Sequence, residues 1–163
     1  MIRLVVVIIF LLNVCISSVV YAQAPVTIEV NAENVINLGP RLEYFEDQKS
    51  QLTLADVRQL TPSAWTRSDS NTPNFGYSDS SFWFRFRVNN QVPCCGASAE
   101  NKIIAIQYAL LDQIEFYQLE NGFLMNKVVT GDIFPFAQRP LRHRDFLLPL
   151  TLKFNQPIDI YIK

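Results

Sequence analysis

Residues 26 to 163 contain short runs in which apolar and polar side chains alternate, separated by turn-forming sequences. The clearest run is Phe82 to Val88, whose even-numbered residues are all large and apolar. A period of two is typical of a β-strand with one buried face. Glu120-Asn121-Gly122 lies between two apolar runs and predicts a hairpin turn. The other predicted strands cover residues 26–30, 42–46, 102–108, 114–119, 124–130, 146–152 and 158–162.

One short helix is predicted next to Thr53. Thr53 is followed three residues later by Asp56, which is a capping pattern, and Leu54 and Val57 would share one face. Pro62 ends this helix. No longer amphipathic helix is predicted, which argues against folds built from alternating strands and helices. The pattern therefore predicts an all-β sandwich of the jelly-roll kind with at most one short helix.

The first 22 residues are predicted to be a signal peptide. Arg3 supplies the positive charge, Leu4 to Leu12 is an unbroken apolar run, and Val20-Tyr21-Ala22 fits a cleavage site that leaves Gln23 first. The alternative is an uncleaved anchor helix, since residues 2–20 are nearly long enough to span a bilayer. Either reading places residues 23–163 in the periplasm, at the outer face of the inner membrane.

Composition narrows the class of protein. Of the 163 residues, 49% are apolar and 18% are charged, which is typical of one globular domain and excludes a disordered chain. The formal net charge of −1 leaves no basic face, so we expect no nucleic-acid partner. The alternation from Ile158 to Ile162 continues to the end of the chain. We therefore expect a fragment of a longer protein, whose membrane region and output domain are absent.

Cys94 and Cys95 are adjacent, and the third cysteine, Cys15, lies in the predicted leader. An ordinary disulfide joins Cα atoms about 4.4–6.8 Å apart, so neighbouring cysteines pair only in a strained ring. No metal-ligand spacing surrounds the pair. We interpret it as part of a loop, with a redox switch as the alternative.

Seven short segments, in this order, resemble the 7TMR-DISM extracellular domain type 2: Leu52–Val57, Asn74–Ser78, Phe82–Phe86, Leu111–Tyr117, Gly131-Asp132 with Pro135-Phe136, Arg139-Pro140 and Ile160–Ile162. The resemblance implies a jelly-roll sandwich similar to carbohydrate-binding modules. It also implies a ligand-sensing role ahead of a seven-helix membrane segment with a histidine kinase or diguanylate cyclase output. It identifies no ligand, and the Pro93–Gly96 segment departs from it as a loop difference.

Trp83 and Arg85 are the first candidate binding residues. If the phenylalanines of this strand form the core, Trp83 and Arg85 point the other way. An indole can stack on a sugar, and a guanidinium can donate to hydroxyls or carboxylates. The alternative is structural: Trp83 lies under a loop, and Arg85 pairs with a buried carboxylate such as Asp112 or Asp132.

Residues 131–145 form a basic segment in an otherwise neutral chain. Arg139, Arg142 and Asp132 are its candidate ligand-binding residues, and they would form an anion- or sugar-binding rim beside Trp83. The alternative is a solvated loop whose arginines pair with local acids. His143, the single histidine, is predicted to be a surface residue.

Oxygen-bearing side chains are dense in residues 68–80. Asp69, Asn71 and Asp79 could contribute to a Ca²⁺ site, because Ca²⁺ takes about 6–8 oxygen ligands. The spacing is not that of an EF-hand. An ordinary flexible loop is the alternative, and no other cofactor is expected.

No catalytic motif is present: the chain lacks a nucleophile elbow, a His-Glu-x-x-His sequence and a phosphate loop. We therefore predict a non-enzymatic sensor domain that binds a sugar, a small anion or Ca²⁺ and is tethered to the membrane. Two alternatives stay open. One is an interaction or homodimerisation module without a ligand, and the other is a secreted carbohydrate-binding module.

Overall fold

The structure is a computed structural model that describes residues 24–31, 35–92 and 99–163. The predicted signal peptide, Gln23 and the Cys94-Cys95 pair lie outside these ranges. The described strands are β1 (Thr27–Val30), β2 (Glu43–Asp47), β3 (Thr66–Arg67), β4 (Ser81–Asn90), β5 (Glu100–Ile106), β6 (Ile114–Glu120), β7 (Phe123–Thr130), β8 (Phe146–Leu152) and β9 (Ile158–Ile162). Each predicted strand is present, and the two-residue β3 was not predicted.

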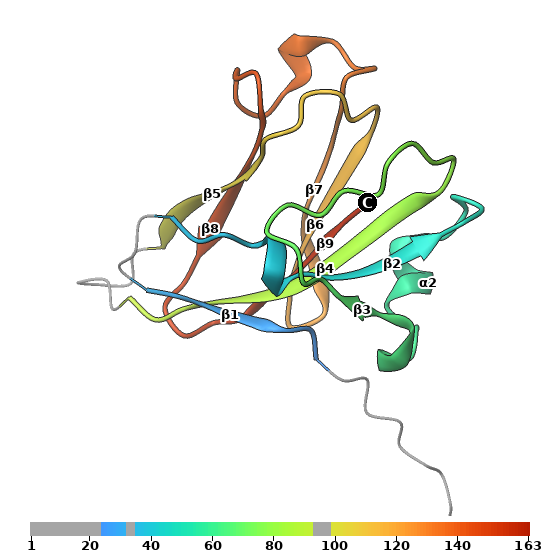
Figure 1. Ribbon diagram of the computed structural model, residues 1–163. Coiled ribbons are helices and arrows are strands. Elements are labelled where there is room, and N and C mark those ends of the chain that lie inside the picture. The colour runs from blue at the N-terminus through green and yellow to red at the C-terminus, as the bar shows by residue number, and fades with distance from the viewer. Residues whose placement is uncertain (1–23, 32–34, 93–98) are drawn as a thin grey trace, which may run out of the picture.

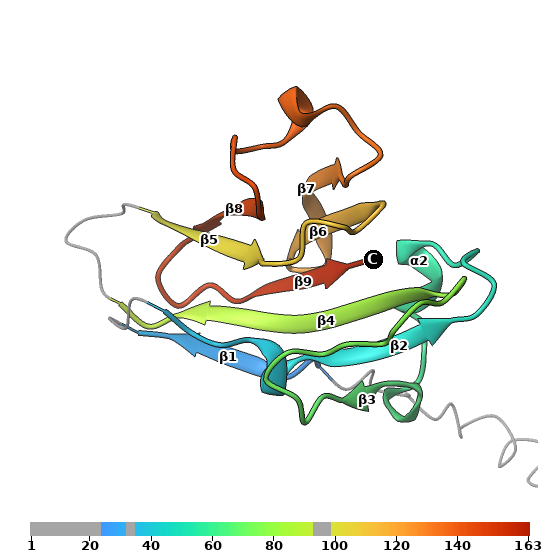
Figure 2. The same ribbon diagram turned by 45° about the horizontal axis from the view of Figure 1, so that its top comes forward.

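The strands form two sheets (Figures 1 and 2). The larger sheet has the order β3-β2-β4-β9-β6-β7, and β1 also pairs with β4. β5 pairs with β8 in a separate two-stranded sheet. The β1–β4 pair is parallel and the other described pairs are antiparallel. The prediction of an all-β sandwich is confirmed.

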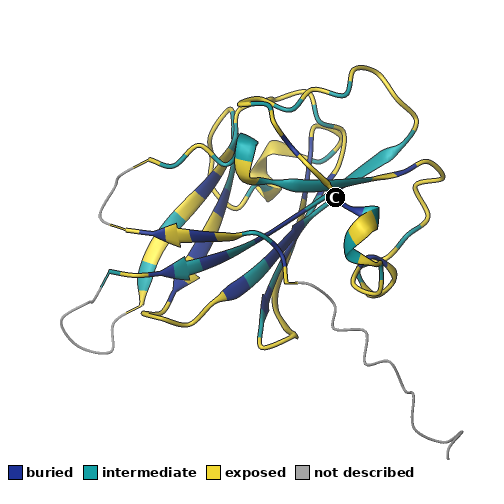
Figure 3. Ribbon diagram, turned by 60° about the horizontal axis from the view of Figure 1, so that its bottom comes forward, coloured by how far each residue is buried: buried dark blue, intermediate teal, exposed yellow. Residues whose placement is uncertain are grey.

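The main core lies between the two sheets. Phe86, Phe116 and Ile160 of the larger sheet pack with Leu148 and Leu150 of β8, and each of these side chains is buried. Apolar area removed from water contributes about 25 cal/mol per Å² to stability, so this cluster supplies much of the driving force for folding. Figure 3 shows the buried positions concentrated along the strands and the exposed ones along the connecting loops.

The opposite face of the larger sheet carries a second, smaller core. Trp83, Tyr117 and Tyr161 lie there beneath Val57 and Trp65, and all five are buried. Both faces of β4 are therefore covered. A strict period of two cannot reveal this, because it reports one apolar face and leaves the other undetermined.

The phenylalanine face of β4 is only partly as predicted. Phe86 is fully buried, whereas Phe82 and Phe84 are half-buried at the margin of the main core. Phe75, from the loop before β4, stacks on Phe82 at a centroid distance of 4.1 Å and also contacts Phe84 and Tyr44. The loop thus closes the edge of the sandwich at this end.

The predicted helix exists as α2 (Leu54–Val57) and has the predicted cap. The Thr53 hydroxyl accepts from the Asp56 backbone N–H, and the Asp56 carboxylate accepts from the Thr53 backbone N–H. Three 3₁₀ turns complete the elements of the described chain: η1 (Gly39–Arg41), η2 (Pro62–Ala64) and η3 (Phe136–Gln138). Among the described residues, no helix has the length and apolar character needed to cross a membrane.

The predicted hairpin joins β6 to β7. Asn121 and Gly122 have φ angles of 51° and 80°. Two consecutive positive φ values are typical of the turn whose twist matches an antiparallel strand pair. A register shift between Gln118 and Leu119 bends this ribbon toward α2.

Candidate functional site

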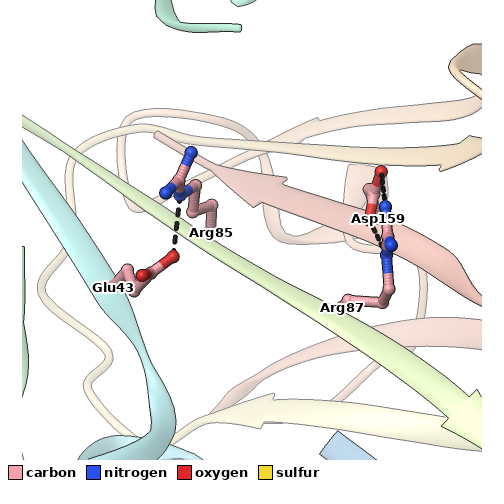
Figure 4. A network of polar contacts seen from close by, with 4 residues as sticks. All are labelled: Glu43, Arg85, Arg87 and Asp159. Carbon is pink, nitrogen blue, oxygen red and sulfur yellow. Dashed lines mark hydrogen bonds and ion pairs between the residues drawn. The ribbon is translucent and has the colours of Figure 1, made fainter. Parts of the chain in front are cut away.

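Arg85 is a buried structural arginine. Its side chain is 6% exposed, and its Nε donates to Glu43 Oε2 at 2.8 Å (Figure 4). The guanidinium also lies 4.3 Å from the centre of the Trp65 ring. The structure thus corrects the prediction that Arg85 lies on an exposed docking face. Of the sequence-based alternatives, an ion pair was right in kind, but its partner is Glu43 and neither Asp112 nor Asp132.

Trp83 is not a surface aromatic residue either, because its exposed fraction is 0%. Its ring stacks on Tyr117 with a centroid distance of 5.9 Å, and the Lys163 ammonium lies 5.4 Å from its centre. The prediction of an open aromatic platform is therefore corrected. The physical reason is that residues 51–65 pack over this face of the sheet and form the second core.

Trp83 nevertheless lines the largest cleft of the described structure. We call it the α2 cleft. It has a volume of about 570 Å³, within the ~300–1,000 Å³ usual for small-molecule sites. The α2 segment forms one wall, and the β6–β7 hairpin forms the other. The lining residues are Gln51, Leu52, Thr53, Leu54, Ala55, Arg58, Trp83, Glu115, Tyr117, Leu124, Lys127 and Lys163.

The charges of the α2 cleft are unbalanced. Arg58, Lys127 and Lys163 are cationic, and Glu115 is the one carboxylate among the lining residues. Arg58 extends toward the opposite wall, since its Nη2 lies 3.4 Å from where a Cβ would stand at Gly122. Low-dielectric walls strengthen such a field, so the cleft favours a ligand with a negative group.

A polar network links the two strands of the hairpin. The Tyr117 hydroxyl donates to Glu115 Oε2, and the Lys127 ammonium lies 3.0 Å from the same oxygen. Burial by itself would raise the pKa of Glu115, but the hydrogen bonds from Tyr117 and Lys127 outweigh it and lower the pKa below its usual range. The bond to Glu115 also raises the pKa of Lys127, so both groups are charged at neutral pH.

Lys163 connects the cleft to the end of β9. Its ammonium donates to the carbonyl oxygens of Ser50 and Leu52 at 3.3 and 3.1 Å. Its backbone exchanges two hydrogen bonds with Glu115, each 2.9 Å long. The last residue of the strand is therefore fixed to both walls of the cleft.

The sequence analysis did not identify Glu115, Tyr117, Lys127 or Lys163 as site residues. Alternation within residues 114–120 places Glu115 and Tyr117 on one face, and this signal was available. Lys127 lies opposite Tyr117 only because of the register shift in the hairpin. No sequence pattern announces such a bulge.

Arg139 serves its own loop and lies apart from Trp83. Its Nη1 donates to the carbonyl oxygens of His143 and Arg144 at 2.8 and 2.6 Å. The guanidinium also lies 4.2 Å from the Phe146 ring centre and 5.1 Å from that of Phe136. The predicted rim of Trp83, Arg85 and Arg139 therefore does not exist as one surface.

The other two candidates of the basic segment, Arg142 and Asp132, are exposed. His143 is also exposed, as predicted, and its Nδ1 accepts from the Asp145 backbone N–H. These residues lie in the loop between β7 and β8, and none of them lines the α2 cleft.

Asp69, Asn71 and Asp79 are exposed and have different neighbours. Asn71 Oδ1 accepts from Asn37 at 3.4 Å, while the backbone oxygen of Asp79 accepts from Ser50 Oγ at 2.9 Å. Within the described ranges, no three acidic, histidine or cysteine side chains gather in a group that could hold a metal ion. Calcium binding by this loop stays a prediction.

The network at Glu115 predicts a pH-dependent contribution to stability. A carboxyl whose folded-state pKa is lowered stabilises the fold above its unfolded pKa of about 4.3, and the effect is lost as the pH falls below it. We expect Glu115→Gln to cost about 1 kcal/mol at neutral pH, since Glu115 and Lys127 are partly exposed. Urea unfolding at several pH values measures this.

The matched control is Glu46→Gln, which changes an exposed carboxylate outside the cleft. The difference between Glu115→Gln and the wild type should vanish below about pH 4, where both side chains are neutral. A constant difference across this pH range would contradict the network.

The chain was compared with known families and proteins. It matches the family described as 7TMR-DISM extracellular 2 over residues 39–163, which is most of its length. No curated protein matches it. The matched range contains both walls of the α2 cleft and all strands after β1.

Proposed function

The chain belongs to the 7TMR-DISM extracellular 2 family of extracellular sensor domains in membrane signalling proteins, and we propose that it is the periplasmic ligand-sensing domain of such a transducer. In this proposal it is non-catalytic and is tethered to the inner membrane. The α2 cleft is the ligand site. A kinase or cyclase output elsewhere in the protein would report its occupancy.

The ligand we propose is a small acidic saccharide or a similar carboxylate. The observation that carries this choice is the composition of the α2 cleft, where three cations and one carboxylate surround apolar and aromatic walls. Lys127 and Arg58 would bind the anionic group through charge-assisted hydrogen bonds. Tyr117, Leu54 and Leu124 would contact the apolar face of the sugar ring.

Occupancy would reach the end of the domain through Lys163. A ligand that bridges the α2 segment and the β6–β7 hairpin prefers one separation of these walls, and so it biases their equilibrium. Lys163 contacts both walls, through Leu52 on one side and Glu115 on the other. The position of the last residue of the chain therefore depends on the state of the cleft.

A thermal-shift screen tests the proposal. Glucuronate, glucose, inorganic phosphate and Ca²⁺ are added separately, and we expect glucuronate to raise the melting temperature because it binds only the folded state. Lys127→Gln should weaken glucuronate binding roughly 10- to 100-fold in calorimetry, as expected for one lost charge-assisted bond.

The control is Lys153→Gln, because Lys153 forms a comparable pair with Glu120 at 3.2 Å and does not line the cleft. It should bind glucuronate like the wild type. A shift with Ca²⁺ alone would favour the 68–80 loop as the site. If no compound shifts the melting temperature, the interaction-module alternative becomes the better description.

A further inference from the structure

Two loops form one surface beside the start of β6. The first loop, residues 107–113, follows β5, and the second, residues 131–145, follows β7. The backbone N–H groups of Asp132 and Ile133 donate to the carbonyl oxygens of Leu111 and Asp112 at 2.7 and 3.3 Å. Gly131 permits this contact, because a Cβ there would lie 2.0 Å from the Asp112 oxygen.

This surface exposes an unusual number of large apolar side chains. We call the following five residues the loop patch: Tyr108, Leu110, Ile133, Phe136 and Leu141, with exposed fractions of 54, 67, 65, 52 and 36%. Single exposed apolar residues are ordinary, but a group of them on adjoining loops marks an interaction surface.

The same surface is basic at its tip. Residues 136–144 contain three arginines and no acidic residue. Arg139 is held inside the loop by its bonds to two carbonyl oxygens, which leaves Arg142 and Arg144 at the surface. The side chain of Arg144 is 87% exposed, and its Nε lies 3.5 Å from Asp145 Oδ1.

The loop patch lies at the end of the sandwich where the chain reaches Lys163. The Lys163 backbone pairs with Glu115, the second residue of β6, and β7 ends opposite Ile114. Both loops and the C mark therefore lie toward the same end of the strands in Figure 1. The proposed function attaches the domain to the membrane beyond Lys163, so this end would face the bilayer.

We propose that the loop patch binds an anionic phospholipid surface, an inference that rests on the proposed membrane attachment. Exposed aromatic and aliphatic side chains insert at the level of the headgroups, and arginines bind lipid phosphates. The patch combines both features on one rigid pair of loops. Contact with the bilayer would fix the orientation of the sensor relative to the membrane.

Vesicle sedimentation at low salt tests this proposal. The full chain should sediment with vesicles of phosphatidylglycerol and phosphatidylcholine, but not with phosphatidylcholine alone. The double variant Arg142→Gln/Arg144→Gln should bind the anionic vesicles roughly five-fold more weakly for each arginine removed. Lys153→Gln, a cation outside the patch, should bind like the wild type.

A fluorescence experiment tests the apolar part independently. In Phe136→Trp the added indole should shift its emission to shorter wavelength when anionic vesicles are present. In the control Phe123→Trp, whose residue is 76% exposed at the β6–β7 hairpin, the emission should not shift. Phe123 marks the opposite end of β6 from the patch.

Equal binding by the double variant and the wild type, or equal shifts at positions 136 and 123, would overturn the proposal. So would absence from the anionic vesicle pellet together with self-association through the patch. Glucuronate binding to the same variants reports on the α2 cleft. Loss of vesicle binding with glucuronate binding retained therefore refutes the patch without refuting the sensor function.

Discussion

Arg85→Ala should lower the free energy of unfolding by about 3–5 kcal/mol. The substitution leaves the Glu43 carboxylate, which is 19% exposed, without its 2.8 Å partner in a poorly solvated site. It also removes the guanidinium that packs 4.3 Å from the Trp65 ring, and so it opens space in the second core. Urea unfolding followed by circular dichroism measures the loss.

Arg87→Ala is the matched control because Arg87 lies on the same strand and face and pairs with Asp159 across β9 (Figure 4). Its side chain is 30% exposed, so water can solvate the remaining carboxylate. We expect a loss of about 1 kcal/mol there. If Arg85→Ala costs no more than Arg87→Ala, Arg85 is not the buried structural residue described above.

Trp83→Ala should also cost about 3–5 kcal/mol, since its ring is fully buried and the space left behind cannot collapse completely. The loss includes the stacking on Tyr117 and the contact beneath the Lys163 ammonium. The α2 cleft should lose its floor, and glucuronate binding should fall with stability. Differential scanning calorimetry measures the stability change.

Phe84→Ala provides the comparison on the opposite face of β4. Phe84 is half-buried, so its loss should be roughly half of that for Trp83. If Phe84→Ala proves the more damaging of the two, the main burden of packing lies on the phenylalanine face, and the second core is overestimated.

The strands could be predicted because their information is local. The alternation from Phe82 to Val88, the Asn121-Gly122 turn and the Thr53–Asp56 cap each depend on a few neighbouring residues, and each is present in the structure. β3 was missed because two residues are too short for a period to show. Its pairing with β2 comes from tertiary contacts.

The site could be predicted only in part. Trp83 was correctly selected and does line the cleft, but its burial depends on residues 51–65 folding over the sheet. The partner of Arg85 follows from the register that places Glu43 opposite it, and sequence spacing does not determine that register. Arg139 was misplaced because the fold of its loop is set by two carbonyl oxygens.

The central claim is that the α2 cleft holds the ligand. The most direct test is to titrate the isotope-labelled chain with glucuronate and follow its backbone amide signals by nuclear magnetic resonance. We predict that the signals of residues 51–58 and 115–127, which form the two walls, move with increasing glucuronate. Movement confined to residues 69–79 or 136–145, or no movement at all, would contradict it.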